Sequence, residues 1–131
     1  MKEQTKELTR AEEQVMQILW QLKEGFVKDI IEKMPAPKPA YNTVSTIIRI
    51  LDAKGFVGHK AFGKSHQYFP LISKQEYSDR SLNSLVTGYF DNSYQNLVSF
   101  FTKGDKVSVK ELEAMQAMIE EELKAKKGGK L

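Results

Sequence analysis

The 131-residue sequence predicts a mainly α-helical fold with one small β-hairpin. In most segments apolar residues recur every three or four positions, which is the period of an α-helix. The segment 56–70 differs, because aromatic and β-branched residues stand on both sides of Gly63, a pattern typical of a hairpin. Proline and glycine clusters separate these segments and divide the chain into short elements.

The first two predicted helices follow a capping box at Thr9 and Glu12, whose side chains satisfy the first free backbone amides of a helix. The apolar face of the first helix ends near Glu24-Gly25. A shorter helix repeats the same spacing over residues 27–34. Three prolines within residues 35–39 prevent its continuation, because proline lacks an amide donor.

A third helix is predicted from Ala40 or Tyr41 to Lys54, and Gly55 supplies a left-handed stop. On a helical wheel one apolar stripe faces the core, formed by Val44, Ile47, Ile48 and Leu51. Three short helices followed by a hairpin are the layout of a winged helix-turn-helix domain. We assign it to residues 1–72.

Residues 73–131 predict an α-helical dimerisation domain. Capping boxes at Ser73-Glu76 and Ser108-Glu111 open helices, and a further short helix fits residues 94–101. These helices carry more apolar surface than a piece of this length can bury alone, and a second copy of the chain would cover it. The alternative is packing against the first domain. The candidate dimerisation residues are Leu85, Tyr89, Leu97, Phe100, Phe101, Leu112, Met115 and Ile119.

The basic charge of the chain is concentrated in one segment. Net charge is +3, with 11 basic and 8 acidic residues in 1–72 and 9 of each in 73–131. Residues 38–66 hold five Lys/Arg against one Asp, as in a protein that meets a polyanion. The N-terminus lacks the apolar core of a signal peptide, and no run is long and apolar enough for membrane insertion. We therefore expect a cytoplasmic protein.

The third helix and the hairpin together predict binding to double-stranded DNA. Asn42, Thr46 and Arg49 lie opposite the apolar stripe of the helix, where short polar side chains and one Arg suit base edges and phosphates. Basic residues of the hairpin, with His59 as a further candidate, suit the phosphate backbone. The alternatives are a face that touches only water and a winged-helix module that binds protein. The candidate DNA-binding residues are Asn42, Thr43, Ser45, Thr46, Arg49, Lys60, Lys64 and His66.

The sequence offers little for enzymatic or metal chemistry. There is no cysteine, and neither His59 nor His66 has an evident nucleophile or carboxylate partner by sequence. Two histidines alone make a weak metal site, so solvated hairpin residues are the better interpretation. We expect no enzyme, no metal and no cofactor.

Five stretches of the chain resemble the penicillinase-repressor (BlaI/MecI type) family of bacterial regulators. They are LTRAEEQVMQILW, VKDIIEKM, YNTVSTIIRILDAKGFV, QYFPLISKQEY and LVSFFTKGDKVSVKELEAM. The most specific array is Thr43, Val44, Thr46, Arg49 and Lys54-Gly55. The resemblance implies a homodimeric repressor on an inverted-repeat operator. The DNA-contacting positions of the family then correspond to Asn42, Thr43, Thr46 and Arg49, with further contacts from Lys60 to His66.

The resemblance also bears on induction. Some relatives respond to a membrane sensor and a protease, which leads to cleavage after an Asn that precedes a Phe in the dimerisation region. The corresponding pair here is Phe100-Phe101, so the Asn is absent and the resemblance does not predict cleavage. An upstream sensor or protease is a partner implied by the resemblance alone. The Cys-rich motif of copper-responsive relatives is also absent.

Overall fold

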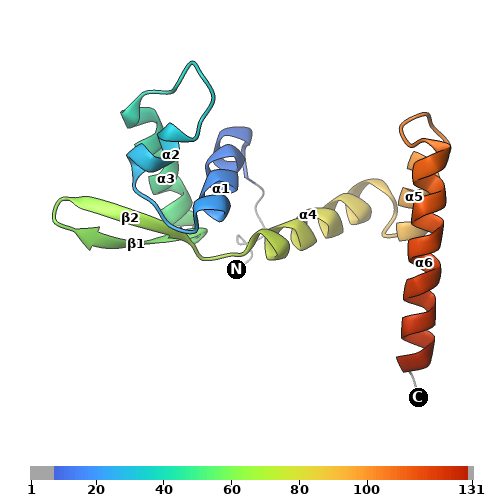
Figure 1. Ribbon diagram of the computed structural model, residues 1–131. Helices are drawn as coiled ribbons and strands as arrows, with labels where there is room; N and C mark the ends of the chain where they lie inside the picture. The colour runs from blue at the N-terminus through green and yellow to red at the C-terminus, as the bar shows by residue number, and fades with distance from the viewer. Residues whose placement is uncertain (1–7, 130–131) are drawn as a thin grey trace. The chain divides into compact units, whose positions relative to one another are not determined.

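The computed structural model describes residues 8–129 and confirms the predicted fold class, helices with one antiparallel hairpin (Figure 1). The chain forms two compact units, one up to Leu82 and one from Asn83 onward. The elements are α1 (Arg10–Leu22), α2 (Val27–Glu32), α3 (Tyr41–Lys54), β1 (Val57–Phe62), β2 (Ser65–Pro70), α4 (Lys74–Tyr89), α5 (Tyr94–Thr102) and α6 (Val109–Gly129).

Helix α1 begins at the predicted capping box and ends earlier than predicted. The Glu12 amide donates to Thr9 Oγ1 at 3.2 Å, and the Thr9 amide donates to Glu12 Oε1 at 3.0 Å. The helix ends at Leu22 rather than near Glu24-Gly25. The reason is that Gly25 pairs with Tyr68 of β2, through N–H···O distances of 2.9 and 2.8 Å. Gly25 therefore extends the edge of the hairpin and is not a helix stop.

The hairpin follows α3 directly and has the predicted turn. Gly55 ends α3 with a left-handed φ of 86°, and Gly63 has a φ of 63° at the turn between the strands. Both angles suit glycine, because a Cβ is unfavourable at positive φ. The register runs from Val57↔Pro70 to Phe62↔Ser65.

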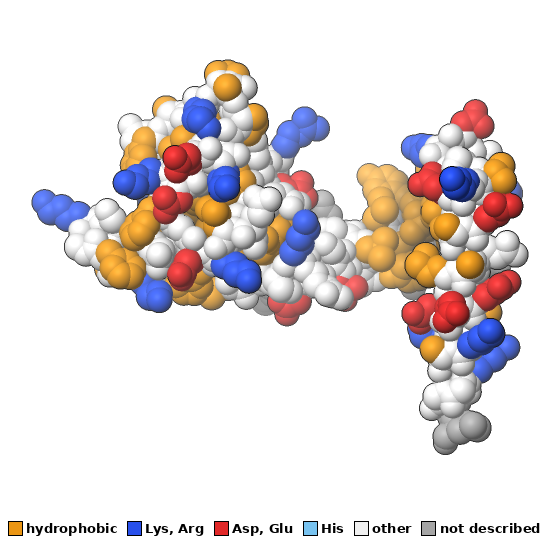
Figure 2. Space-filling view, viewed as in Figure 1, with side chains coloured by type: hydrophobic (Ala, Val, Ile, Leu, Met, Phe, Trp, Pro, Cys, Tyr) orange, Lys and Arg blue, Asp and Glu red, His pale blue; other side chains and the backbone are white. Residues whose placement is uncertain are grey.

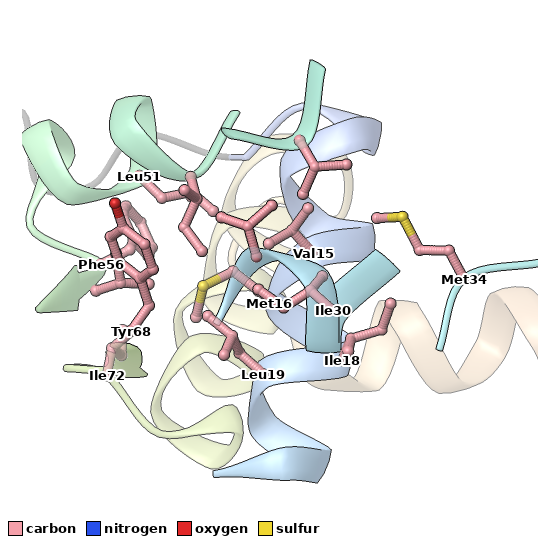
Figure 3. Close-up of a cluster of buried hydrophobic side chains, with 14 of the residues drawn as sticks. Val15, Met16, Ile18, Leu19, Ile30, Met34, Leu51, Phe56, Tyr68 and Ile72 are labelled. Carbon is pink, nitrogen blue, oxygen red and sulfur yellow. The ribbon is translucent and has the colours of Figure 1, made fainter. Parts of the chain in front are cut away.

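One hydrophobic core holds the first unit together (Figure 3). Val15 and Leu19 of α1, Ile30 of α2, Leu51 of α3 and Tyr68 of β2 are all buried in it. The predicted stripe of α3 faces this core, with Val44, Ile48 and Leu51 fully buried and Ile47 half-buried, which confirms the wheel. Burial of each such side chain contributes about 1.5–3 kcal/mol.

The first turns of α4 belong to the first core. Tyr77 is buried, and its ring lies 6.0 Å from those of Trp20 and Phe56. The Leu8 amide donates to Tyr77 Oη at 3.1 Å, and Trp20 Nε1 donates to the Ile72 carbonyl at 2.8 Å. The division between the compact units therefore falls inside α4. The functional boundary between residues 72 and 73 stays a prediction.

The second unit has almost no interior of its own. Its capping box is formed as predicted, with Ser108 and Glu111 exchanging hydrogen bonds of 3.3 and 3.1 Å. Among residues 83–129, however, Val86 alone is buried. Hydrophobic side chains gather instead on the surface of this unit (Figure 2). Within residues 8–129 no helix is long and apolar enough to cross a membrane.

A largely buried ion pair joins the start of α1 to the end of α3. Lys54 Nζ, in the last turn of α3, lies 2.9 Å from Glu12 Oε1 in the first turn of α1. Burial alone would raise the pKa of the Glu12 carboxyl, but hydrogen bonds from Lys54 and Thr9 lower this pKa below its ordinary value. A lowered pKa means that the ionised carboxylate stabilises the fold at neutral pH, and that this contribution is lost as pH falls.

We therefore predict that Glu12→Gln lowers the free energy of unfolding at neutral pH by about 1–3 kcal/mol, because it removes the charge of a hydrogen-bonded buried group. Below about pH 4 the difference from the wild type should shrink, since the wild-type carboxyl is then becoming protonated. Urea unfolding over this pH range measures both effects. The matched control is Glu13→Gln, one residue further along and exposed. Equal losses in the two variants would contradict the role of the ion pair.

Candidate nucleic-acid interface

The outward face of α3 has the predicted composition. Asn42, Thr43, Thr46 and Arg49 are exposed, and Ser45 is half-buried. This face is opposite the buried stripe because a helix turns about 100° per residue. Arg49 Nη2 donates to Ser45 Oγ at 3.3 Å, one turn back along the helix. The guanidinium therefore has a local partner and keeps donors for a further acceptor.

The hairpin presents its basic residues on different sides. Lys60, Lys64 and His66 are all exposed. Lys60 pairs across the strands with Gln67, while His66 pairs with Ala61. Because successive residues of a strand point to opposite faces, Lys60 and His66 lie on opposite faces of the hairpin. Lys64 lies at the tip, after Gly63.

His59 joins the hairpin to α3. Its Nδ1 lies 2.7 Å from Asp52 Oδ2 in the last turns of the helix. Its ring also stacks on His66, with centroids 4.5 Å apart and planes 13° apart. The carboxylate partner that sequence reasoning did not find is thus Asp52. Within residues 8–129, no group of three or more His, Cys, Asp or Glu side chains could hold a metal ion.

Lys38, counted in the basic segment, closes the end of α2. Its Nζ donates to three backbone carbonyls at 2.7–3.2 Å, those of Ile31, Glu32 and Met34. The last carbonyls of a helix lack intrahelical donors, so a lysine there satisfies them and opposes the helix dipole. Lys38 therefore has a structural role that its sequence position did not reveal.

A cavity of about 510 Å³ lies between α2, α3 and the hairpin, and we call it the wing cavity. It brings together four of the predicted DNA-binding residues, namely Ser45, Arg49, Lys64 and His66. The other four, Asn42, Thr43, Thr46 and Lys60, lie outside it. The predicted set is therefore split between the wing cavity and the open surfaces of α3 and β1.

The wing cavity also contains residues that sequence reasoning missed. Lys28 of α2 and Tyr41, the first residue of α3, both line it. Phe26 and Phe62 form another part of the wall, with ring centroids 5.8 Å apart in an edge-to-face contact. Lys28 precedes the basic segment in sequence, and Phe26, Tyr41 and Phe62 are far apart in the chain. No local pattern could have grouped them.

Tyr68 also lines the wing cavity and is buried. Burial raises the pKa of its hydroxyl, and the Asp52 carboxylate raises it further, while Arg49 lowers it. The hydroxyl therefore stays protonated and can donate a hydrogen bond at physiological pH.

None of the predicted dimerisation residues is buried in the single chain. Tyr89 is 80% exposed and Phe100 is 63% exposed. Leu85 and Ile119 are also exposed, whereas the remaining four are half-buried, namely Leu97, Phe101, Leu112 and Met115. The Phe100 ring contacts Phe90 edge to face at 5.4 Å, and Lys106 Nζ lies 6.0 Å from its centroid, so the ring has local contacts while most of its surface stays exposed.

Comparisons with known proteins identify the relatives of the chain. The family model described as penicillinase repressor matches residues 8–121. The methicillin resistance regulatory protein MecI of Staphylococcus aureus (strain N315) is 27% identical over 120 residues, covering 91% of this chain and 98% of that protein. The penicillinase repressor of Bacillus licheniformis is 22% identical over 122 residues, covering 92% and 95%.

Among solved structures, the DNA-binding domain of the repressor BlaI matches 54% of this chain and 88% of its own, at 24% identity and a TM-score of 0.48. This likeness is weak.

For Lys38 we predict a stability effect that is separate from any effect on DNA. Lys38→Met should lower the free energy of unfolding by about 1–2 kcal/mol, because three carbonyls lose a charged donor. Urea unfolding measures it, with Lys33→Met as control, since Lys33 is exposed on the same helix end. The role would be refuted if Lys38→Met left stability unchanged and instead weakened DNA binding.

Proposed function

The chain belongs to the penicillinase repressor family, and from this premise we propose that it is a homodimeric repressor that binds an inverted-repeat operator in double-stranded DNA. One observation carries the DNA part of the proposal. The outward face of α3 is polar and exposed, and the basic hairpin lies beside it. Both the membership of a family of repressors and the polar, basic surface favour a function in binding nucleic acid over an enzymatic function.

In the proposed complex α3 enters the major groove. Asn42 and Thr46 near its N-terminal half meet base edges, and the Thr methyl suits the thymine methyl. Arg49, one turn further on, binds guanine O6 and N7 or a phosphate. Lys60, Lys64 and His66 contact the phosphate backbone, which adds salt-dependent affinity without reading sequence.

The lack of an interior in the second unit supports the homodimer. Val86 is the one buried side chain among residues 83–129, and a folded piece of this size needs more buried apolar surface to be stable. A second copy would cover Tyr89 and Phe100, which are the most exposed of the predicted dimerisation residues. A two-fold dimer places its recognition helices on two half-sites, which is why we propose an inverted-repeat operator.

Repression in this proposal is steric, since an occupied operator excludes polymerase. The protein acts in the cytoplasm, where the DNA is. A sensor or protease upstream stays a prediction from family resemblance. The pair Phe100-Phe101 lies within α5, and Phe100 stands where those relatives have the Asn.

The alternative is a winged-helix module that binds protein. Tyr41 and Ile50 are the exposed large apolar residues of α3, and protein interfaces use such side chains. Genomic footprinting of the full chain distinguishes the two functions. Protection of discrete palindromic sites supports the repressor, and the neighbouring genes then identify the regulon. Uniform or absent protection would favour the protein-binding module.

If Arg49 reads a base rather than a phosphate, Arg49→Ala weakens binding to the protected operator by about 1–3 kcal/mol and weakens binding to random DNA much less. Fluorescence anisotropy with both duplexes measures the difference. Equal losses on operator and random DNA would argue against base readout.

Lys60→Ala should behave differently from Arg49→Ala. It should weaken binding to all duplexes similarly and reduce the slope of log affinity against log salt by about 1, as loss of one phosphate contact does. Titrations at several salt concentrations measure the slope. Lys33→Ala is the matched control, an exposed lysine of the first unit outside the proposed interface. An unchanged slope for Lys60→Ala would place Lys60 away from the DNA.

Phe100→Glu should raise the dissociation constant of the dimer at least about thirtyfold, because it puts a charge into an apolar contact that occurs twice in a symmetric interface. Sedimentation velocity at micromolar concentration measures this change. Leu71→Glu is the control, since Leu71 is 58% exposed and lies in the first unit. A wild-type monomer with intact helical content would contradict the homodimer.

A further inference from the structure

The wing cavity has the size of a small-molecule site. Its volume of about 510 Å³ falls within the range of about 300–1,000 Å³ that is usual for ligand pockets. An apolar cavity of about 150 Å³ already accepts benzene, so a substituted ring fits in this space. The cavity lies within the first unit, between α2, α3 and the hairpin.

The charges around the cavity are of one sign. Lys28 of α2, Arg49 of α3 and Lys64 of the hairpin turn line it, and His66 adds an imidazole. None of the described residues that line it carries a carboxylate. The two carboxylates nearby already have partners, because Asp29 accepts from the Phe26 amide at 2.9 Å and Asp52 is paired with His59. The wall therefore favours an anion, and the guanidinium offers the two parallel donors that suit a carboxylate or phosphate.

The remaining wall is largely aromatic. Phe26, Tyr41, Phe62 and Tyr68 line the cavity from α3, both strands and the residue before α2. Phe62 is 52% exposed although its ring contacts Phe26, so one side of it is open. A phosphate of duplex DNA gains little from such rings. A flat apolar group gains their full contact area and the offset or edge-to-face geometry that aromatic pairs prefer.

We propose that the wing cavity binds a small aromatic anion, such as an aromatic carboxylate, and that this ligand competes with DNA. The cations hold the acid group, and the Phe26 and Phe62 rings hold the aromatic ring. Ser45, Arg49, Lys64 and His66 belong both to the cavity and to the predicted DNA contacts. Because the two ligands use the same side chains, binding of one excludes the other.

This competition rests on the proposed function, whereas binding of the anion does not. Competition would release the protein from DNA, because the bound anion occupies part of the proposed DNA-binding surface. Such release needs no cleavage at Phe100-Phe101.

Calorimetric titration of the full chain tests the cavity with salicylate as the probe. Acetate supplies the anion without the ring, and benzyl alcohol supplies the ring without the charge. We expect salicylate to bind with a dissociation constant of about 1 mM or tighter, and both comparison compounds to bind at least about tenfold more weakly. No salicylate binding, or equal binding of benzyl alcohol, would overturn the proposal.

Three variants place the ligand in the cavity. Phe62→Ala removes one ring, and Lys28→Ala removes one charge, and each should weaken salicylate about fivefold to tenfold. The control is Lys33→Ala, which should leave the affinity for salicylate unchanged. Lys33 is exposed like Lys28 but lies at the other end of α2. Circular dichroism checks that each variant is folded. Equal affinities of all three variants would put salicylate elsewhere on the protein and refute the site.

A competition titration with a labelled duplex tests the consequence. Salicylate should raise the apparent dissociation constant for DNA of the wild type in proportion to its occupancy, and should do so less for Phe62→Ala at the same concentration. Salicylate that binds in the cavity without displacing DNA would refute the competition. If the chain binds no DNA at all, the proposed function fails. The calorimetry of the wild type and the variants still shows whether the cavity binds the aromatic anion.

Discussion

The burial of one stripe of α3 is the interaction on which the rest of the first unit depends. Val44, Ile48 and Leu51 are fully buried against α1, α2 and the hairpin, and together they contribute several kcal/mol. Their burial also sets the rotation of α3 about its own axis. Once this stripe faces inward, the period of the helix places Asn42, Thr46 and Arg49 in solvent. Packing and the proposed recognition of DNA therefore use opposite faces of the same helix.

Polar links between distant segments hold the other elements around α3. Glu12 of α1 pairs with Lys54 at one end of the helix, and His59 of the hairpin pairs with Asp52 in its last turns. Gly25 adds backbone hydrogen bonds to β2. Apolar burial alone is non-directional, whereas these hydrogen bonds have a defined geometry. The His59–Asp52 and Gly25–Tyr68 links therefore orient the hairpin relative to α3 and to the segment before α2, and these elements form the wing cavity.

The second unit follows a different principle. It has well-formed helices with a capping box at Ser108 and Glu111, yet Val86 alone is buried among residues 83–129. Helical caps and propensities can define helix ends, but tertiary burial supplies most helix stability in proteins. A unit of this kind depends on apolar contacts from outside itself. For this reason the proposed function joins DNA binding to self-association.

The sequence by itself determined the features that depend on residues close together in the chain. These include the capping boxes, the left-handed stop at Gly55, the hairpin turn at Gly63, the proline-rich break and the two faces of α3, and all were predicted correctly. Only the tertiary structure decided the features that join distant segments. Helix α1 ends at Leu22, because Gly25 pairs with β2. The Lys38 side chain donates hydrogen bonds to carbonyls at the end of α2. The tertiary structure also brought Lys28, Tyr41 and Phe62 to one cavity. Periodicity and capping report interactions within about one helical turn, whereas these contacts form only when the whole core has packed.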